Sequence, residues 1–67
     1  MHLIVNGTPT EIPDSVKSIT DLLQELGLAE KLVAVEVNKV LIPQTRHSDY
    51  ILSDCDQVEA VTFVGGG

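Results

Sequence analysis

The pattern of apolar and polar residues at the start of the chain predicts a β-hairpin. Residues 2–5 contain three consecutive apolar side chains, and Asn6 and Gly7 follow them directly. Asn-Gly favours a two-residue hairpin turn because both residues tolerate positive φ angles. Residues 8–12 are therefore expected to return as a second strand. Pro9 cannot donate to a strand ladder, which predicts that this strand lies at a sheet edge or begins irregularly.

A helix is predicted to begin at Ser18. Ser18 and Asp21 have the spacing of a capping box, in which each side chain accepts a hydrogen bond from the backbone of the other residue. Gly27 is suited to the left-handed residue that follows the end of a helix. Between them, apolar side chains recur at the spacing of a single helical face; they are Ile19, Leu22, Leu23 and Leu26.

The second half of the chain predicts more strands. Residues 32–37 alternate in hydrophobicity, which indicates a half-buried strand. A turn at Asn38-Lys39 leads to a short strand over residues 40–42, which Pro43 ends.

The remaining residues are predicted to hold loops and one long strand. Residues 44–50 are polar and are expected to be irregular, and Ile51-Leu52 is expected to be a short buried segment. Residues 53–56 have the composition of a turn. The β-branched segment 57–64 is predicted to be the last strand.

This order of elements predicts an α+β fold, with a hairpin, a crossover helix and further strands in one sheet. About four to five strands would pack against one main helix. Residues 1–64 would form the single domain and residues 65–67 a flexible tail. The first and last strands are both strongly apolar, so we expect them to be central neighbours.

Composition narrows the choice of partners. Ten acidic residues against four basic ones give a net charge of −6. This charge argues against binding to nucleic acid or to an anionic membrane surface, and it favours a basic partner. The apolar runs are too short for a transmembrane helix, and no signal peptide is apparent. A single cysteine excludes an internal disulfide framework and favours a reducing, cytoplasmic compartment.

Signals for catalysis or metal binding are weak. His2 and His47 lie on unrelated segments without convergent partners, so we expect neither to form a site. Asp49, Asp54 and Asp56 lack the ligand spacing of a calcium loop, and turn chemistry explains them better. We therefore expect no bound metal or cofactor.

Cys55 is a candidate sulfur-relay nucleophile, but its neighbours argue against that role. A reactive thiol needs a lowered pKa, which a nearby cation or a helix N-terminus provides. Asp54 and Asp56 flank Cys55 and would raise its pKa instead. Cys55 is therefore interpreted as an ordinary turn residue.

The three glycines at the end of the chain need an explanation. Gly65, Gly66 and Gly67 follow a strand directly, where they cannot pack and are costly to order. One interpretation is a frayed tail. The other is an arm that threads a narrow channel in a partner and presents the terminal carboxylate, since three extended residues span about 10 Å.

Several segments along the chain, taken together, form a recognisable pattern. They are Val5-Asn6-Gly7, Ser18-Ile19-Thr20-Asp21-Leu22-Leu23, Val33-Ala34-Val35-Glu36-Val37-Asn38, Ile42-Pro43, Asp56-Gln57-Val58 and Gly66-Gly67. In this order, and over essentially the whole chain, they resemble the ThiS family of sulfur carriers in thiamine (thiazole) biosynthesis. This chain departs from the family pattern where Cys55-Asp56 replaces a frequent Gly-Asp. It also departs where Gln44 and His47 replace a frequent arginine and aromatic residue.

The resemblance implies a β-grasp, ubiquitin-like fold and a carrier rather than an enzyme. A ThiF-like adenylating enzyme would use ATP to activate the Gly67 carboxylate. A sulfur donor, such as a cysteine desulfurase, would convert it to a thiocarboxylate for a ThiG-like thiazole synthase. Gly65 and Gly66 would thread the partner's active site, and the exposed face of the last strand near Phe63 and Val64 would contact the partner. Because alternate residues of a strand point inward, the sequence leaves open whether each of these two side chains faces the partner or the core.

Three alternatives remain open at this point. The first is a MoaD-like carrier for molybdopterin synthesis, which shares the tail and the chemistry but has another acceptor. The second is a carrier for another pathway, such as cysteine synthesis or protein conjugation. The third is a β-grasp binding module without covalent chemistry, which would not need Gly66 and Gly67.

Overall fold

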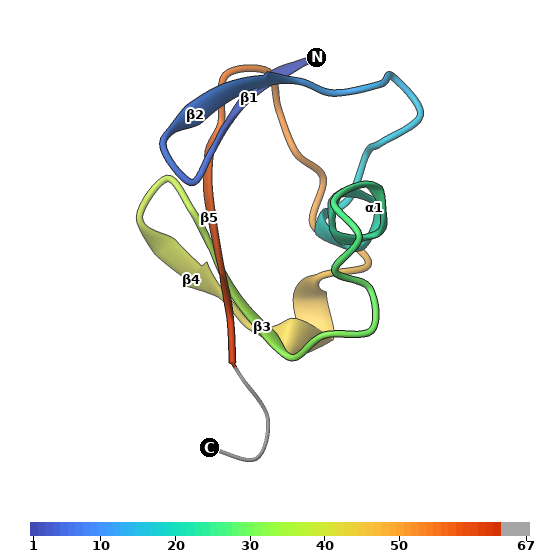
Figure 1. Cartoon of the computed structure of the whole chain (residues 1–67), viewed down its shortest axis with the longest axis vertical. Helices are drawn as coiled ribbons and strands as arrows, with labels where there is room; N and C mark the ends of the chain where they lie inside the picture. Colours follow the sequence, from blue (N-terminus) through green and yellow to red (C-terminus); the bar gives the residue numbers. More distant parts are fainter. Residues whose placement is uncertain (64–67) are drawn as a thin grey trace.

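One helix packs on one side of a five-stranded mixed sheet in the computed structural model, which describes residues 1–63 (Figure 1). The strand order is β2-β1-β5-β3-β4. The α+β prediction is confirmed. The elements are β1 (His2–Val5), β2 (Thr8–Glu11), α1 (Ile19–Glu25), β3 (Val33–Val37), β4 (Val40–Ile42), the 3-10 helix η1 (Gln44–Arg46) and β5 (Gln57–Thr62).

Strand β5 lies at the centre of the sheet, between β1 and β3. It pairs in parallel with β1 and antiparallel with β3, while the two hairpins β1–β2 and β3–β4 are antiparallel. The prediction that the first and last strands are neighbours is confirmed. Pro9 lies on β2, the edge strand that its missing N–H predicts.

The hydrophobic core lies between the sheet and α1. Ile19 and Leu22 of the helix are completely buried. Alternate residues of the strands face them, because successive side chains of a strand point to opposite faces; the most deeply buried are Leu3, Val35, Val37 and Val58. The other face of these strands is the open face of the sheet.

The helix has the capping box that its sequence predicts. Ser18 Oγ accepts a hydrogen bond from the Asp21 N–H at 3.1 Å, and Asp21 Oδ2 accepts one from the Ser18 N–H at 3.1 Å. Gly27 has a φ of +75°, as expected for the left-handed residue after a helix. The helix therefore begins and ends at residues whose local chemistry dictates it.

Left-handed residues shape the three turns that the sequence predicts. Asn6 and Gly7 join β1 to β2, and Asn38 and Lys39 join β3 to β4, all with positive φ. Cys55 has a φ of +70° in the turn before β5. Cys55 thus occupies a conformation that favours glycine.

Some predicted boundaries were wrong. The last strand ends at Thr62 rather than at Val64, which lies outside the described residues. Ile51 is 62% exposed although Leu52 beside it is buried, so only half of that predicted buried pair is buried. The extended backbone at Ile51, which forms an isolated bridge with Ser18, points adjacent side chains in opposite directions.

The polar segment before Ile51 also contains a short helix that the sequence did not predict. Pro43 precedes η1, and its carbonyl accepts a hydrogen bond from the Arg46 N–H at 2.9 Å. Such short 3-10 turns are common connectors with little sequence signature. No helix in residues 1–63 is long and apolar enough to cross a membrane.

Candidate functional site

The central strand β5 leads to the predicted site at the chain end. Phe63 follows β5, and its N–H donates to the Leu32 carbonyl at 3.0 Å, which continues the pairing of β5 with the chain before β3. Val64 and the glycines 65–67 lie outside the described residues. The predicted roles of Gly65, Gly66, Gly67 and Val64 therefore stay predictions.

Phe63 is on the molecular surface. It is 57% exposed, and it lies two residues after Val61, which is also exposed and also faces away from the helix. The sequence left open whether Phe63 faces the core or solvent, and the structure places it in solvent. An exposed aromatic side chain beside the chain end is available for contact with a partner.

The open face around Phe63 is organised in three cross-strand rows. The first row is Leu41, Glu36 and Glu59, which are paired in register across β4, β3 and β5. The second row is Ala34 and Val61, and the third is Leu32 and Phe63. We call these seven residues the open-face rows. They run from an acidic row to two apolar rows nearer the chain end.

Sequence reasoning missed most of the open-face rows. The outward positions follow from alternation along each strand, so Val61 and Glu59 were within reach of the sequence pattern. The rows themselves depend on the register between β3, β4 and β5, which the sequence does not reveal.

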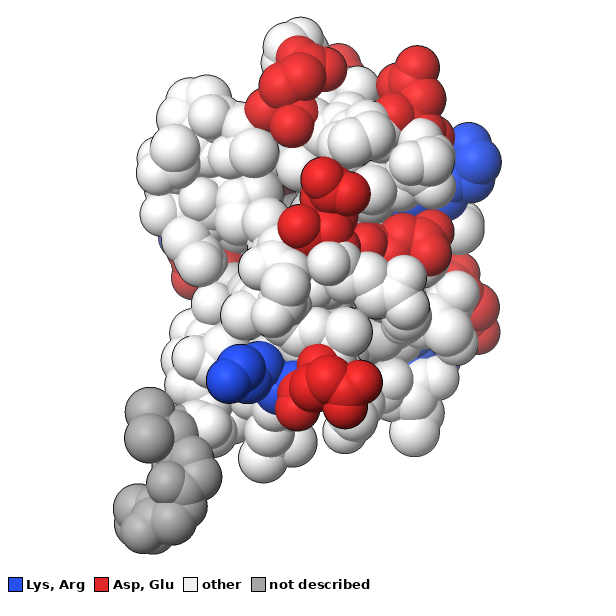
Figure 2. Space-filling model, turned by 45° about the vertical axis from the view of Figure 1, so that its right-hand side comes forward, with Lys and Arg blue, Asp and Glu red and all other residues white. Residues whose placement is uncertain are grey.

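Acidic side chains shape the surface potential. Figure 2 shows several separate groups of acidic side chains on a mostly uncharged face, with fewer basic ones among them. A surface of this sign attracts basic partners at a distance and repels polyanions. This distribution agrees with the preference for a basic partner that the net charge indicates.

The carboxylates near the turn before β5 bind protein groups. Asp54 Oδ1 accepts a hydrogen bond from the His2 N–H at 2.7 Å, and Asp56 Oδ2 accepts one from the Ser53 N–H at 2.8 Å. Asp49 Oδ1 accepts a hydrogen bond from Arg46 Nε at 3.1 Å. Each of the three carboxylates thus has a separate structural role in a turn.

Cys55 lies in an environment that suppresses thiolate formation. The negative charge of Asp54 raises the pKa of the Cys55 thiol, and the thiol also donates a hydrogen bond to Asp54 Oδ2 at 3.6 Å. Burial and the Asp56 charge raise this pKa further. The thiolate is the nucleophilic form of cysteine, so these groups make Cys55 less reactive. The pKa argument made from the sequence is confirmed.

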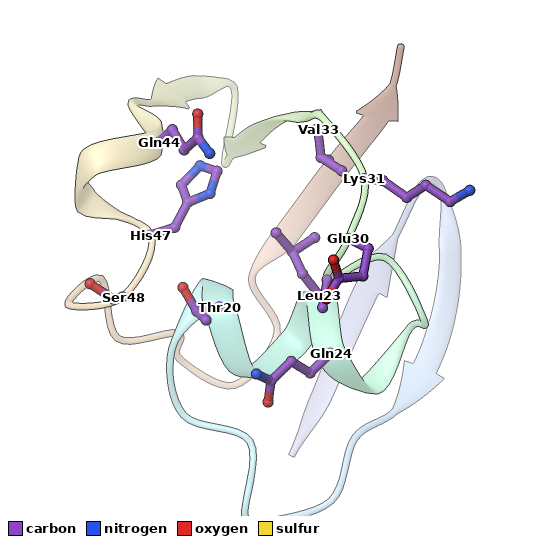
Figure 3. Close-up of a pocket in the computed structure, with 10 residues that line it drawn as sticks. Thr20, Leu23, Gln24, Glu30, Lys31, Val33, Gln44, His47 and Ser48 are labelled. Carbon is purple, nitrogen blue, oxygen red and sulfur yellow. The ribbon is translucent and has the colours of Figure 1, made fainter. Parts of the chain in front are cut away.

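A hollow of about 360 Å³ lies between α1, the loop before β3 and η1 (Figure 3). Its wall includes Leu23, Gln24 and His47. His47 is only 6% exposed, and its Nε2 donates to the Ile42 carbonyl at 3.1 Å. His47 therefore connects the end of η1 to β4 through a buried hydrogen bond.

The comparison with known families decides which group this chain belongs to. The family model described as "ThiS family" matches residues 3–67. The chain belongs to the ThiS family. Its β-grasp fold is confirmed by a crystal structure of the thiamine biosynthesis protein ThiS from Geobacter metallireducens. That structure matches with a TM-score of 0.81 and 34% identity, over 100% of both chains.

This ThiS-family chain is similar to a sulfur carrier of about its own length and to a segment of two longer thiazole synthases. The sulfur carrier protein ThiS of Bacillus subtilis is 40% identical over 65 residues, which cover 97% of this chain and 98% of that protein. A thiazole synthase of Paramagnetospirillum magneticum is 36% identical over 67 residues. The chain spans 20% of the length of that synthase and of a second one from Magnetococcus marinus.

Proposed function

We propose that this chain is a sulfur carrier of thiamine biosynthesis, with the Gly67 carboxylate as the group that carries sulfur. The observation that supports this most strongly is its similarity, over nearly the whole of both chains, to the sulfur carrier protein ThiS of B. subtilis. The chain itself is a carrier on which partner enzymes act.

The fold suits a carrier that presents its chain end. Strand β5 is held on one side by β1 and on the other by β3, so the last strand before the chain end is fixed at the centre of the sheet. After Phe63, the sequence continues with Val64 and then with Gly65, Gly66 and Gly67. Glycine lacks a Cβ, so a narrow active-site channel can accept such a segment while the folded body stays outside.

The proposed chemistry starts with activation. A carboxylate is a poor electrophile, so a ThiF-like enzyme joins the Gly67 carboxylate to the α-phosphate of ATP, forming an acyl-adenylate and releasing pyrophosphate. The terminal sulfur of a cysteine desulfurase persulfide then attacks the acyl carbon and displaces AMP. A second thiol attacks the donor's sulfur in the acyl disulfide, which leaves the Gly67 thiocarboxylate and a new disulfide.

Delivery of the sulfur regenerates the carrier. The thiocarboxylate sulfur is a soft nucleophile that adds to a carbonyl carbon of the acceptor held by thiazole synthase. The π electrons of that carbonyl move to its oxygen, which takes up a proton. Water then cleaves the bond between sulfur and the Gly67 acyl carbon, which restores the carboxylate and leaves the sulfur on the acceptor. No free sulfide is released in this sequence.

The thiazole synthase matches favour thiamine biosynthesis over a MoaD-like role. Two thiazole synthases contain a segment similar to this entire chain. A carrier segment joined to a synthase is expected when the two act in succession, because covalent linkage raises their effective concentration. We propose a ThiG-like synthase as acceptor, ATP use by the adenylating enzyme alone, and a cytoplasmic location, where the single cysteine stays reduced.

Intact-protein mass spectrometry tests the proposed function. The chain is incubated with ATP, a purified ThiF-like enzyme, a cysteine desulfurase, cysteine and a reducing thiol. We expect a mass gain equal to sulfur replacing one oxygen, located in the C-terminal peptide. The matched controls are a chain that lacks Gly66 and Gly67, which should gain nothing, and Cys55→Ser, which should react like the wild type.

The outcomes separate the alternatives. A sulfur adduct on Cys55 instead of the C-terminal peptide would contradict the proposal and favour a cysteine relay. A thiocarboxylate that supports molybdopterin synthase but not thiazole synthase would favour a MoaD-like role. The absence of any adduct, with an enzyme that is active on a known carrier, would favour a binding module.

A further inference from the structure

The described chain ends beside the hollow that Figure 3 shows. The Phe63 N–H donates to the Leu32 carbonyl at 3.0 Å. Lys31 and Val33, which flank Leu32 in the sequence, belong to the wall of the hollow. Thr62, the last residue of β5, is paired in register with Val33. The segment after Phe63 therefore starts next to this wall.

The hollow and the end of β5 are on the same side of the sheet. Helix α1 forms part of the wall, so the hollow lies on the helix side. Thr62 points to that side as well, because it follows the buried Ala60 by two positions and alternates with the exposed Val61. The same alternation predicts the helix side for Val64. The chain end can thus enter the hollow without passing around an edge of the sheet.

The segment after Phe63 is long enough to cross the hollow. It has four residues, Val64 and the glycines 65–67, which span about 13 Å when extended. Glycine adopts positive and negative φ angles about equally well, so this segment can turn back sharply. The hollow has a volume of about 360 Å³, within the range of sites that hold small ligands. Three residues without side chains are a small occupant for such a space.

The wall combines apolar contacts with hydrogen-bond donors. Leu23 and Val33 offer apolar surface that suits a valine side chain. Thr20, Gln44 and Ser48 carry hydroxyl or amide groups that can donate to a carboxylate. A segment with one apolar residue, three glycines and a terminal carboxylate is complementary to this combination.

Lys31 supplies the positive charge of the wall. Within residues 1–63, its ammonium group forms no ion pair. Figure 3 shows the side chain extending away from the hollow. This side chain is exposed and has a flexible stem, so it can turn toward a carboxylate that enters the hollow. Glu30 also belongs to the wall and opposes a carboxylate, so the contact is weak enough for a partner to displace.

We propose that the free protein folds residues 64–67 back into this hollow, where the Gly67 carboxylate pairs with Lys31. The contact is an autoinhibitory one, because Gly67 cannot lie in the hollow and in the active site of an adenylating enzyme at the same time. The fold-back itself is independent of the proposed function, whereas its effect on activation rests on that function. The apparent affinity of the enzyme falls in proportion to the fraction of chains whose tail is free.

Backbone amide chemical shifts measured by NMR test the contact without any enzyme. Figure 3 shows Thr20 and Ser48 across the hollow from Lys31, so covalent proximity to the chain end does not affect them. The first variant carries an amide in place of the terminal carboxylate, so its tail keeps its length and loses only its charge. A synthetic peptide of residues 55–67 joined at Cys55 supplies it.

The amidated chain should show shifted Thr20 and Ser48 signals, while the signal of Leu41 on the open face should stay unchanged. Lys31→Gln in the carboxylate chain should shift the same two signals in the same direction. Lys31→Gln in the amidated chain should add almost nothing, because the pair is already broken. Unchanged Thr20 and Ser48 signals in the amidated chain would overturn the proposal. An additional shift of full size from Lys31→Gln in that chain would overturn it as well.

Thiocarboxylate formation at limiting ThiF-like enzyme tests the autoinhibition. Exposed ion pairs are weak, so we expect Lys31→Gln to speed the reaction by about two- to fivefold. Lys17→Gln makes the same change of charge outside the hollow and should react like the wild type. Equal rates for Lys31→Gln and Lys17→Gln would contradict the autoinhibitory effect. If the wild-type chain gains no sulfur from an active enzyme, the proposed function fails, and the chemical shifts still decide whether the tail occupies the hollow.

Discussion

The side-chain amide of Asn6 binds both backbone groups of Ala60. Asn6 Oδ1 accepts a hydrogen bond from the Ala60 N–H at 2.8 Å, and Asn6 Nδ2 donates to the Ala60 carbonyl at 3.3 Å. Strand β1 ends at Val5, so this side chain continues the pairing with β5 beyond the last residue of its parallel neighbour. Asn6 thereby secures the part of β5 that leads to the chain end.

Asn6→Ala is expected to lower the free energy of unfolding by about 1–3 kcal/mol, because Ala60 loses both side-chain partners. Alanine is also unfavourable at the φ of +49° that Asn6 adopts. Asn6→Gly is the matched control, since it loses the same hydrogen bonds but tolerates this φ, so its loss should be smaller. Urea unfolding measures both, and wild-type stability in both variants would show that the amide contributes nothing.

The contrast between the turn and the amide shows what the sequence can predict. Asn6-Gly7 predicts the hairpin because the turn is local and its φ angles select those residues. The bonds to Ala60 depend on a residue 54 positions away. They also need β1 and β5 to be parallel neighbours. The apolar character of the two strands predicts that they lie side by side, but it does not predict their relative direction.

Asp21 makes the stability of the domain depend on pH. Hydrogen bonds from the backbone of Ser18 and then of Lys17 lower the pKa of Asp21. A carboxyl whose pKa is lowered by folding stabilises the protein above its unfolded pKa of about 3.9. That stabilisation is lost as pH falls through the lower, folded pKa.

Asp21→Asn should therefore lower the free energy of unfolding at pH 7, and its difference from the wild type should shrink as the pH is lowered below about 4. Glu25→Gln makes the same change of charge on an exposed helical position and is the control. Thermal unfolding from pH 7 to pH 2 measures both variants. A difference that stays constant over this range would contradict a role for the Asp21 charge.

Cys55→Gly is expected to stabilise the protein, although it removes a side chain. Cys55 has a φ of +70°, and the left-handed region is unfavourable by about 1 kcal/mol for residues other than glycine. The greater entropy of glycine in the unfolded chain offsets part of this gain. Cys55→Ala keeps the unfavourable φ, so it should not be stabilised. Equal stabilities of the two variants in urea would show that the backbone conformation at this position is not strained.

The Cys55 thiol should alkylate slowly near neutral pH, because the Asp54 charge raises its pKa. Asp54→Asn should lower this pKa and speed the reaction with iodoacetamide at pH 7 several-fold, since only the thiolate reacts. Glu30→Gln is a distant control for the change in net charge. The pH profile of the alkylation rate measures the shift. An unchanged profile in Asp54→Asn would exclude Asp54 as its main cause.

The sequence predicts the candidate site at the terminal glycines better than it predicts the open face of the sheet. The glycines 65–67 stand out because a strand followed by three glycines has no packing role, and this inference needs no knowledge of strand order. The open face required the register that places Glu36 opposite Glu59 and Leu41 beside Glu36. A shift of one residue would send these side chains to the core. Register is fixed by the whole fold, so the sequence alone could name Phe63 and Val64 as contacts but not the rows that surround Phe63.

Phe63→Ala tests whether the surface beside the chain end takes part in recognition. Phe63 is exposed, so its removal should change the free energy of unfolding by less than about 0.5 kcal/mol. An exposed aromatic residue that becomes buried on binding is often worth more than 1 kcal/mol to a complex, so we expect thiocarboxylate formation at limiting enzyme to slow by about tenfold. Ile51→Ala removes an equally exposed apolar side chain beside Ser18, on the helix side, and should react like the wild type. Equal rates for both variants would place the contact surface elsewhere, whereas slowing by both would show that general surface hydrophobicity, rather than Phe63, governs the reaction.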